Sequence, residues 1–301
     1  MNKLSDRTLG IILALIATVL GAAFMIPWKV ATGLGQESDM VLILVITAAI
    51  FNSGTLGFQE GFLAILKKPS RLEVVISFLF AFLTLLGNQA SAEAIRYLSP
   101  AVVTTIMRAE FIFISFMAWL FLGELIGKRF LLAIAIVMMG FYIMQPSFDI
   151  KGDWWIGAIS ATVAAFSFAA MAVITRRYVA SINITRVNSF RLWLSFFLWF
   201  PIYRTSPNFE DWSFNFVFLV ACAAILGPGL GRLLIMNAAR FIEAKFSAIL
   251  VASSPVFVLF LGALLLGTTP NFDEIIGGSI MIAGVLIALY PNSILRKKEQ
   301  N

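Results

Sequence analysis

Apolar stretches long enough to cross a membrane follow one another along almost the whole chain, and short polar connections separate them. About 30 Å of hydrocarbon is crossed by roughly 20 apolar residues in a helix. Stretches of this kind predict ten helices, near residues 8–31, 39–57, 73–94, 99–121, 129–146, 154–175, 186–203, 214–237, 244–266 and 274–291. The connections are too short for an extramembrane catalytic or receptor domain. The pattern therefore predicts an all-α integral membrane protein with ten transmembrane helices.

The composition of the chain agrees with this pattern. Hydrophobic residues make up 60% of the 301 positions and charged residues only 13%, and the mean hydropathy is +0.93. A soluble domain of this length could not bury so much apolar surface. The first apolar run follows Lys3 and Arg7 and lacks a clear small-x-small cleavage site. We therefore expect a retained first helix rather than a secretory signal, and a chain surrounded by membrane lipids.

Matching residues recur when 144 is added to the residue number, and no gap is needed. The matching pairs are Gly87 with Gly231, Arg96 with Arg240, Tyr97 with Phe241, Gly123 with Gly267 and Gly140 with Gly284. Because each half is predicted to hold five helices, an odd number, the second half must enter the bilayer from the opposite side to the first. The sequence therefore predicts two inverted five-helix repeats, over residues 1–147 and 148–301.

Lysine and arginine gather at one set of predicted helix ends. Fifteen lie at the ends that include both termini, and four lie at the opposite ends. Positively charged connections are typical of the cytoplasmic side. We therefore expect a multi-pass protein of the cytoplasmic (inner) cell membrane with both termini in the cytoplasm. The net charge of +6 is accounted for by this bias and requires no nucleic-acid partner.

Three further arginines fall well inside predicted helices: Arg108, Arg191 and Arg232. An arginine near the bilayer centre costs about 2.5–3.5 kcal/mol on insertion scales. Such a residue persists where it faces a partner, a water-filled cavity or a substrate. Arg191 lies only about two turns from the cytoplasmic end of its helix, so the favoured interpretation is that its side chain snorkels to that surface.

Arg108 and Glu110 lie two residues apart in one predicted helix. At about 100° per residue they are roughly 200° apart around the axis of a continuous helix, so they cannot pair on one face. One is expected to line a cavity and the other to meet a neighbouring helix, and the sequence does not say which. Arg108 either contacts substrate or makes structural hydrogen bonds. Glu110 either carries a coupling proton, because burial favours a protonated carboxyl group, or neutralises an arginine.

The repeat gives Arg232 additional weight, because subtracting 144 places Asn88 at the equivalent position of the first half. Polar residues at equivalent positions suggest a shared central site. A run of glycine and proline, Gly227-Pro228-Gly229 with Gly231, comes directly before Arg232. It predicts a bend or an unwound segment beside the charge. The alternative is that these glycines only allow close helix packing.

The predicted helix 8–31 can be laid on 154–175 with an offset of 147, which matches Gly10 with Gly157. One face of the first helix carries small residues and ends at Trp28, and the equivalent face of the other carries Phe168. We expect Trp28 and Phe168 to contribute to an amphipathic pocket of aromatic and small residues. Plain helix packing is the alternative.

Several kinds of chemistry are missing from the sequence. Without histidine, no histidine-activated nucleophile or histidine metal ligand is possible. The chain contains no phosphate-binding loop of the G-x-x-x-x-G-K-[ST] type. The aspartates Asp149, Asp153, Asp211 and Asp273 fall in predicted connections, which excludes an intramembrane aspartyl dyad. We therefore predict that the protein is not an enzyme and uses no cofactor or metal. The oligomeric state is left open.

Two stretches of the sequence resemble a known family. They are Arg96-Tyr-Leu-Ser-Pro-Ala followed by Ala118-Trp-Leu-Phe-Leu-Gly-Glu124, and a second copy with Ser254-Pro-Val-Phe257 and glycines from Gly262 to Gly284. The pattern resembles the EamA-type repeat of the drug/metabolite transporter superfamily. The resemblance implies ten helices in a five-plus-five inverted arrangement, a central substrate path and export of amino acids or other small metabolites. It implies no universal set of substrate-binding residues, so the candidate residues rest on the argument from charge and repeat.

Together these observations predict a secondary transporter of small organic metabolites that works by alternating access. Arg108 and Arg232 are expected to hold a carboxylate, Asn88 to add hydrogen bonds, and Glu110 to receive an amine or a coupling proton. Amino-acid export is the leading version. A transporter of neutral amphipathic compounds is one alternative, and a lipid-handling or structural membrane protein is the other.

Overall fold

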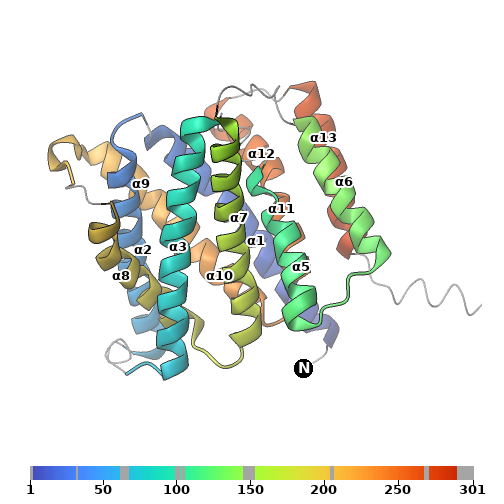
Figure 1. Ribbon diagram of the computed structural model, residues 1–301, viewed down its shortest axis with the longest axis horizontal. Coiled ribbons are helices and arrows are strands. Elements are labelled where there is room, and N and C mark those ends of the chain that lie inside the picture. The colour runs from blue at the N-terminus through green and yellow to red at the C-terminus, as the bar shows by residue number, and fades with distance from the viewer. Residues whose placement is uncertain are drawn as a thin grey trace, which may run out of the picture.

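The computed structural model describes residues 3–31, 33–61, 68–98, 103, 106–144, 153–203, 207–267 and 271–289. All regular structure in these ranges is helical (Figure 1). The α-helices are α1 (Lys3–Ala31), α2 (Glu37–Glu60), α3 (Arg71–Tyr97), α5 (Glu110–Leu122), α6 (Lys128–Met144), α7 (Trp154–Tyr178), α8 (Ile184–Tyr203), α9 (Phe214–Ala224), α10 (Arg232–Ala238), α11 (Ala244–Ala252), α12 (Ser254–Leu266) and α13 (Phe272–Leu289). A 3₁₀ turn, Phe209–Asp211, precedes α9, and a π-helical segment, Ile225–Gly231, joins α9 to α10. The predicted boundary at 147/148 lies outside the described residues.

Seven segments of the described chain are long and apolar enough to cross a membrane. They are Asp6–Trp28, Ser38–Glu60, Arg71–Ser91, Trp154–Tyr178, Phe214–Ala238, Ala244–Leu265 and Phe272–Leu289. Large apolar side chains lie on their outer surfaces, as Phe82 does at 53% exposure. Water would penalise such a surface, whereas lipid does not. The chain is therefore a multi-pass integral membrane protein, as its composition predicts.

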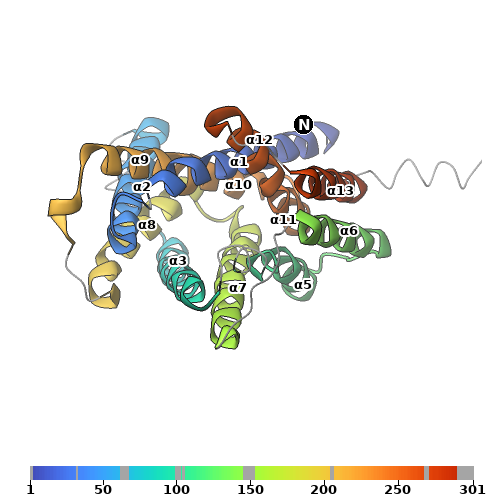
Figure 2. The same ribbon diagram turned by 90° about the horizontal axis from the view of Figure 1, so that it is seen from above.

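The helices form one bundle with a distinct pair at one end. In both views α6 lies beside α13, and α3 lies beside α7 (Figures 1 and 2). At the opposite end α2 packs against α8 and α9. In the view from above, α1 and α10 lie together on one side of the bundle, opposite α3 and α7, and α11 lies beside α5 (Figure 2). The middle of the molecule is therefore bounded by helices from both predicted halves.

The pair formed by α6 and α13 depends on two glycines that permit close contact. A Cβ atom at Gly140 would lie 2.5 Å from the carbonyl oxygen of Gly277, and one at Gly284 would lie 2.7 Å from Cγ2 of Val137. Any larger residue would push the backbones apart, which is why small residues mark close helix contacts in membranes. The two contacts are reciprocal, because Gly140 and Gly284 are related by the predicted offset of 144.

The single helix predicted over 99–121 is wrong in one respect. A turn occupies Arg108–Ala109, where the backbone N–H of Ala109 donates to the carbonyl of Ile106, and α5 begins only at Glu110. The second half has a similar turn at Ser253, between α11 and α12. There Pro255 stands at the start of α12 and favours a new helix, because proline cannot donate to the preceding turn. The residue types at 108–110 give no comparable signal.

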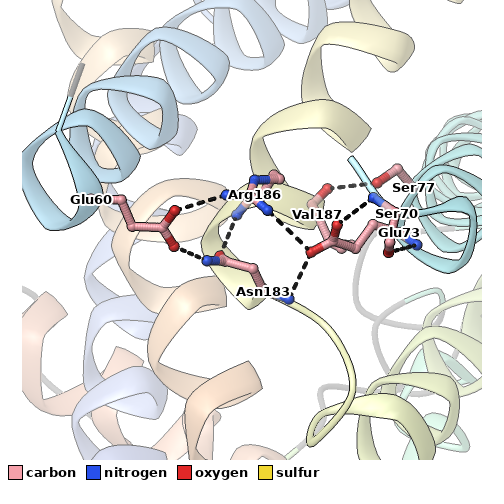
Figure 3. Close-up of polar contacts among 7 residues, drawn as sticks. All are labelled: Glu60, Ser70, Glu73, Ser77, Asn183, Arg186 and Val187. Carbon is pink, nitrogen blue, oxygen red and sulfur yellow. Dashed lines mark hydrogen bonds and ion pairs between the residues drawn. The ribbon is translucent and has the colours of Figure 1, made fainter. Parts of the chain in front are cut away.

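A cluster of polar side chains joins α2, α3 and the start of α8 (Figure 3). The Glu73 carboxylate accepts hydrogen bonds from the backbone N–H groups of Ser70, at 2.8 Å, and of Asn183, at 3.0 Å. Nη1 of Arg186 lies 3.7 Å from the same carboxylate, and its Nη2 lies 2.8 Å from the carboxylate of Glu60. The side-chain amide of Asn183 also donates to Glu60. We call these five residues the Glu73 cluster, and it fastens three helix ends together.

Candidate functional site

A cavity of about 410 Å³ lies in the middle of the bundle. Side chains of α1, α2, α3, α5, α7, α8, α10 and α11 line it, together with Met107, Arg108 and part of the π-helical segment. Its volume falls within the range of small-molecule sites. All six predicted site residues line this cavity: Trp28, Asn88, Arg108, Glu110, Phe168 and Arg232. Their positions are thus close together, and their role in binding stays a prediction.

Arg108 and Glu110 both face the cavity, contrary to the expectation that only one of them would. The expectation assumed a uniform 100° step between residues, and the turn at Arg108–Ala109 breaks that assumption. Glu110 interacts electrostatically with Arg108 and with Arg232. The turn therefore allows Glu110 and Arg108 to line the same cavity as Arg232, which the uniform helix of the prediction did not allow.

Arg108 connects the two predicted halves of the chain. Its Nη1 donates to Oγ of Ser254 at 3.4 Å, and its guanidinium lies 5.9 Å from the centre of the Phe141 ring, within the range of a cation–π contact. Nε of Arg108 is buried and has no hydrogen-bond partner in the described part of the chain. Neither contact supplies a full counter-charge, so Arg108 keeps a free donor.

Arg232 follows the π-helical segment directly. Its backbone N–H donates to the carbonyl of Gly227, five residues earlier, as in a π-turn. The segment is therefore not unwound, because its backbone hydrogen bonding continues as a π-helix, and the predicted bend stays a prediction. Pro228 supplies the cause, since it has no N–H for the ladder. Its own carbonyl accepts from the side-chain amide of Asn188 at 3.4 Å. Such segments are frequent at functional sites.

The glycines of this segment also allow close packing, as the alternative interpretation proposed. A Cβ atom at Gly227 would lie 2.8 Å from a ring carbon of Phe24, and one at Gly229 would lie 3.0 Å from a ring carbon of Phe51. The segment thus combines close packing against α1 and α2 with a change of helical geometry before Arg232. In Arg232 itself, Nε and Nη2 are buried, and neither has a partner among the described residues.

Arg191 is a cavity residue that the sequence argument missed. The snorkelling interpretation is wrong, because the residue is only 4% exposed and lines the cavity. Its Nη1 donates to Oγ1 of Thr84 at 3.3 Å, and its Nε is buried without a partner in the described chain. The charge of Arg232 acts on it repulsively. The sequence signal for this position was the depth of Arg191 within an apolar helix. That signal alone would have placed Arg191 among the predicted cavity residues, with Arg108 and Arg232.

The remaining predicted residues contribute mainly apolar walls. The ring of Phe168 reaches across to α3, where a Cβ atom at Gly87 would lie 2.9 Å from it. This contact places Phe168 next to Asn88, the polar residue that follows Gly87. Trp28 stacks on Phe24 with ring centres 5.4 Å apart and an interplanar angle of 27°. The cavity therefore joins an aromatic surface to a charged one.

A second group of polar contacts lies at one boundary of the cavity. Glu124 accepts hydrogen bonds from the backbone N–H groups of Ala244, at 2.8 Å, and Lys245, at 3.3 Å, at the start of α11. Nε of Arg176 lies 3.9 Å from the same carboxylate, and its Nη1 donates to the carbonyl of Ala239. These contacts tie α5, α7, α10 and α11 together where Arg176 and Ala244 line the cavity.

The electrostatic character of the cavity is positive. Apart from Arg176, which lies beside Glu124, its charged lining consists of Arg108, Arg191, Arg232 and the single carboxylate of Glu110. No group of three or more candidate metal ligands occurs among the described residues. The arrangement can hold an anionic group by charge-assisted hydrogen bonds, beside a surface suited to an apolar body.

Comparison with known proteins agrees with this architecture. Residues 155–290 match the model of the EamA-like transporter family. An uncharacterized transporter from Archaeoglobus fulgidus is 22% identical over 235 residues, which cover 76% of this chain and 82% of that protein. A solved crystal structure shares the fold with a TM-score of 0.79 at 15% identity, covering 98% of this chain and all of the other. The resemblance predicted from the sequence is confirmed for residues 155–290, which match an EamA-like transporter domain of the drug/metabolite transporter superfamily.

Proposed function

We propose that this protein is a secondary transporter that exports small organic solutes bearing a carboxylate, with amino acids as the leading case. One observation carries the proposal: Arg108, Arg191 and Arg232 all line the cavity, and each has a buried guanidinium nitrogen that finds no hydrogen-bond partner among the described residues. A buried donor without an acceptor is costly. A carboxylate in the cavity would supply the missing acceptors and counter-charge, with Asn88 adding hydrogen bonds. A binding site of this kind is sufficient for transport and needs no catalytic group.

Alternating access would follow from ten spans arranged as inverted repeats over 1–147 and 148–301. Helices α5 and α12 support this arrangement, because both bounds of α12 equal those of α5 plus 144. Both helices end at a left-handed glycine, Gly123 with φ 68° and Gly267 with φ 66°. The glycine N–H groups donate to the carbonyls of Ala118 and Gly262, a further pair at the same offset.

Contacts between the halves support the same arrangement. A Cβ atom at Gly10 would lie 2.7 Å from Cβ of Phe241, and one at Gly157 would lie 2.9 Å from Cβ of Tyr97. Each half thus places a glycine of its first helix against the equivalent position in the other half. The cavity lies between the halves, and the bond from Arg108 to Ser254 crosses that interface. Rocking of one half against the other would then open the site to each side in turn.

Two further parts of the proposal concern the orientation of the protein in the membrane and the coupling of transport to protons. The bias of positive residues supports cytoplasmic termini in the inner cell membrane. Among the described residues Glu110 is the only carboxylate that lines the cavity, so it is the candidate to carry a coupling proton or to receive the amine of an amino acid. If Glu110→Gln still exchanges solute but transport no longer depends on a proton gradient, Glu110 carries the coupling proton.

The test is counterflow in proteoliposomes preloaded with unlabelled amino acids, with entry of labelled ones as the readout. Counterflow needs no driving gradient, so ignorance of the coupling ion does not matter. We expect entry with the wild type, and its loss in Arg108→Gln and Arg232→Gln. The matched control is Arg240→Gln, which removes a positive charge from an exposed residue at the end of α10. Entry that persists unchanged in both cavity variants would contradict the proposal.

The aromatic wall of Phe24, Trp28 and Phe168 favours a second candidate, a transporter of neutral amphipathic compounds. In that case the arginines would serve structure only. The same vesicles distinguish the two candidates, because a neutral aromatic solute would then exchange while no carboxylate competes with it. Exchange of labelled lipid between leaflets, with neither solute class transported, would instead favour a lipid-handling protein.

A further inference from the structure

The positive charges of the cavity outnumber its negative charges by two. Arg108, Arg191 and Arg232 line it together with Glu110 as the one carboxylate, and Arg176 is engaged by Glu124 at the boundary. Glu110 is attracted to Arg108 and to Arg232, so a single carboxylate serves two guanidinium groups. Within the described part of the chain, Arg191 has only the neutral hydroxyl of Thr84 as its hydrogen-bond partner. The imbalance is therefore greatest on the side of Arg191.

The position of Arg191 next to Arg232 makes this imbalance more costly. The two guanidinium groups repel each other, and like charges interact strongly where water is excluded. Between them they hold three buried N–H groups without a partner, Nε of Arg191 and Nε and Nη2 of Arg232. Arg108 adds a single one, its Nε. The free donors thus fall into two sets, those of Arg191 and Arg232 and that of Arg108, and all three side chains line the same cavity as Glu110.

The charge of a bound solute has to match this arrangement. A zwitterion with one carboxylate and one ammonium group is neutral and would leave the excess of two positive charges in place. A solute with one carboxylate would leave an excess of one. A solute with two acidic groups would supply acceptors to both sets of free donors. It would neutralise the cavity if it carries no ammonium group, and an ammonium group would leave an excess of one positive charge. Uncompensated charges are expensive in a membrane.

We infer, on the basis of the proposed transport function, that the solute carries two acidic groups, one bound by Arg108 and the other by Arg191 and Arg232. The apolar wall at Phe111 and Phe168 contacts the carbon chain between the acids. Two sources share this chemistry, a plain dicarboxylate and an acidic amino acid. They differ by an ammonium group, for which Glu110 is the available partner.

The experiment compares solutes of one length that differ in a single group. Counterflow of labelled glutarate into vesicles with the full-length protein is measured against unlabelled glutarate, its monoamide, glutamate and glutamine as competitors. We expect the two-acid solutes to compete at concentrations roughly tenfold to a hundredfold lower than their amide counterparts, the range of one charged hydrogen-bonded contact. Labelled glutamate is followed in a second series.

Arg191→Gln locates the second acid site. It is expected to remove the preference for two acids, measured as the ratio of the competing concentrations of each two-acid solute and its amide counterpart. Arg191→Lys, which keeps the charge, is expected to restore part of the preference, and thermal unfolding of each purified variant shows whether it folds. Arg240→Gln is again the control for loss of one positive charge. Glu110→Gln assigns the source: selective loss of glutamate competition indicates an acidic amino acid, and unchanged glutarate and glutamate competition indicates a plain dicarboxylate.

The outcomes separate this inference from the proposed function. Equal competition by acid and amide solutes, with Arg191→Gln behaving like the wild type, would overturn the two-acid inference and leave carboxylate transport intact. Absence of exchange for every carboxylate, including the amino acids of the previous test, would overturn both.

Discussion

Two regions of the molecule use arginine in opposite ways. In the Glu73 cluster the terminal nitrogens of Arg186 lie beside the carboxylates of Glu60 and Glu73, and only Nε lacks a partner. In the cavity, among the described residues, Arg191 has a single hydroxyl partner, and Arg232 has no hydrogen bond that engages its buried Nε or Nη2. The first arrangement fastens helix ends by ion pairs. The second leaves donors available, which the proposed function assigns to a bound solute.

The comparison separates stability from binding. A charge that is paired within the protein stabilises the fold, and removing one partner leaves the other as a buried charge without a counter-charge. A buried charge without a pair does not stabilise the fold, so its removal should cost the fold little. Substitutions in the Glu73 cluster should therefore lower the stability of the fold, and substitutions of the cavity arginines should abolish transport.

The largest expected effect is loss of transport in Arg232→Met, which keeps much of the side-chain volume. Solute exchange should fall roughly 30-fold or more, because a buried charged contact is worth about 2–5 kcal/mol when one partner is truncated. The free energy of unfolding should stay equal or rise, since two unsatisfied buried donors disappear. Counterflow and denaturation in detergent measure the two quantities. If Arg232→Met is destabilised, Arg232 stabilises the fold, as Arg186 does.

The next largest effect is destabilisation by Glu73→Gln. The free energy of unfolding should fall by about 2 kcal/mol, because the carboxylate accepts two backbone N–H groups and faces Arg186. Exchange per folded molecule should stay within about twofold of the wild type. The matched control is Glu274→Gln, at a partly exposed carboxylate in the first turn of α13 that accepts from the backbone N–H of Asn271 and forms no ion pair with an arginine among the described residues. A transport defect without destabilisation would break the comparison.

A smaller effect is expected from Thr84→Val, which removes the one hydroxyl that Arg191 contacts. Loss of this hydrogen bond should lower the free energy of unfolding by about 1 kcal/mol. Affinity for the two-acid solute should change by less than the substitution of Arg191 itself changes it. Competition curves for glutarate give the comparison. An effect as large as that of Arg191→Gln would mean that Thr84 orients the guanidinium rather than merely contacting it.

The smallest effect is expected from Ser254→Ala. The bond from Arg108 to the Ser254 hydroxyl is 3.4 Å long, beyond the usual range for a strong contact. Its loss should cost about 0.5 kcal/mol and change exchange by less than threefold. Exchange kinetics in parallel with unfolding would detect more. A larger loss of transport would show that this contact between the halves is needed for movement.

The sequence predicted the membrane-spanning character and the cavity lining well, for physical reasons. A length of apolar helix is a local property, and a charge inside such a helix is conspicuous because it is costly. For that reason Arg108, Glu110 and Arg232 could be selected without a structure. The repeat added Asn88, and the face of the first helix added Trp28. All of them line one cavity.

The errors concern geometry that depends on tertiary packing. Arg191 was assigned to the surface because depth was judged by distance from a helix end, whereas α8 packs against α3 and buries the residue at Thr84. Arg108 and Glu110 were placed on opposite faces because a uniform helix was assumed, and the turn between them has no signal in the residue types. The spacing of hydrophobic residues predicts which residues form a helix. It does not predict a one-residue change in hydrogen bonding, which rotates the following side chains around the helix axis.

The π-helical segment makes the direction of Arg232 a matter of counting residues. A π-turn closes its hydrogen bonds over five residues where an α-turn closes them over four, so Ile225–Gly231 takes up length that an ordinary helix would not. The side chains of α10, after the segment, therefore point in a different direction around the helix axis than they would if α9 continued as an α-helix. Deleting one residue from the segment would rotate Arg232 by about 100° around the axis without changing any charge. The strongest anchor of the proposed site is therefore held in place by the length of a segment that itself carries no charge.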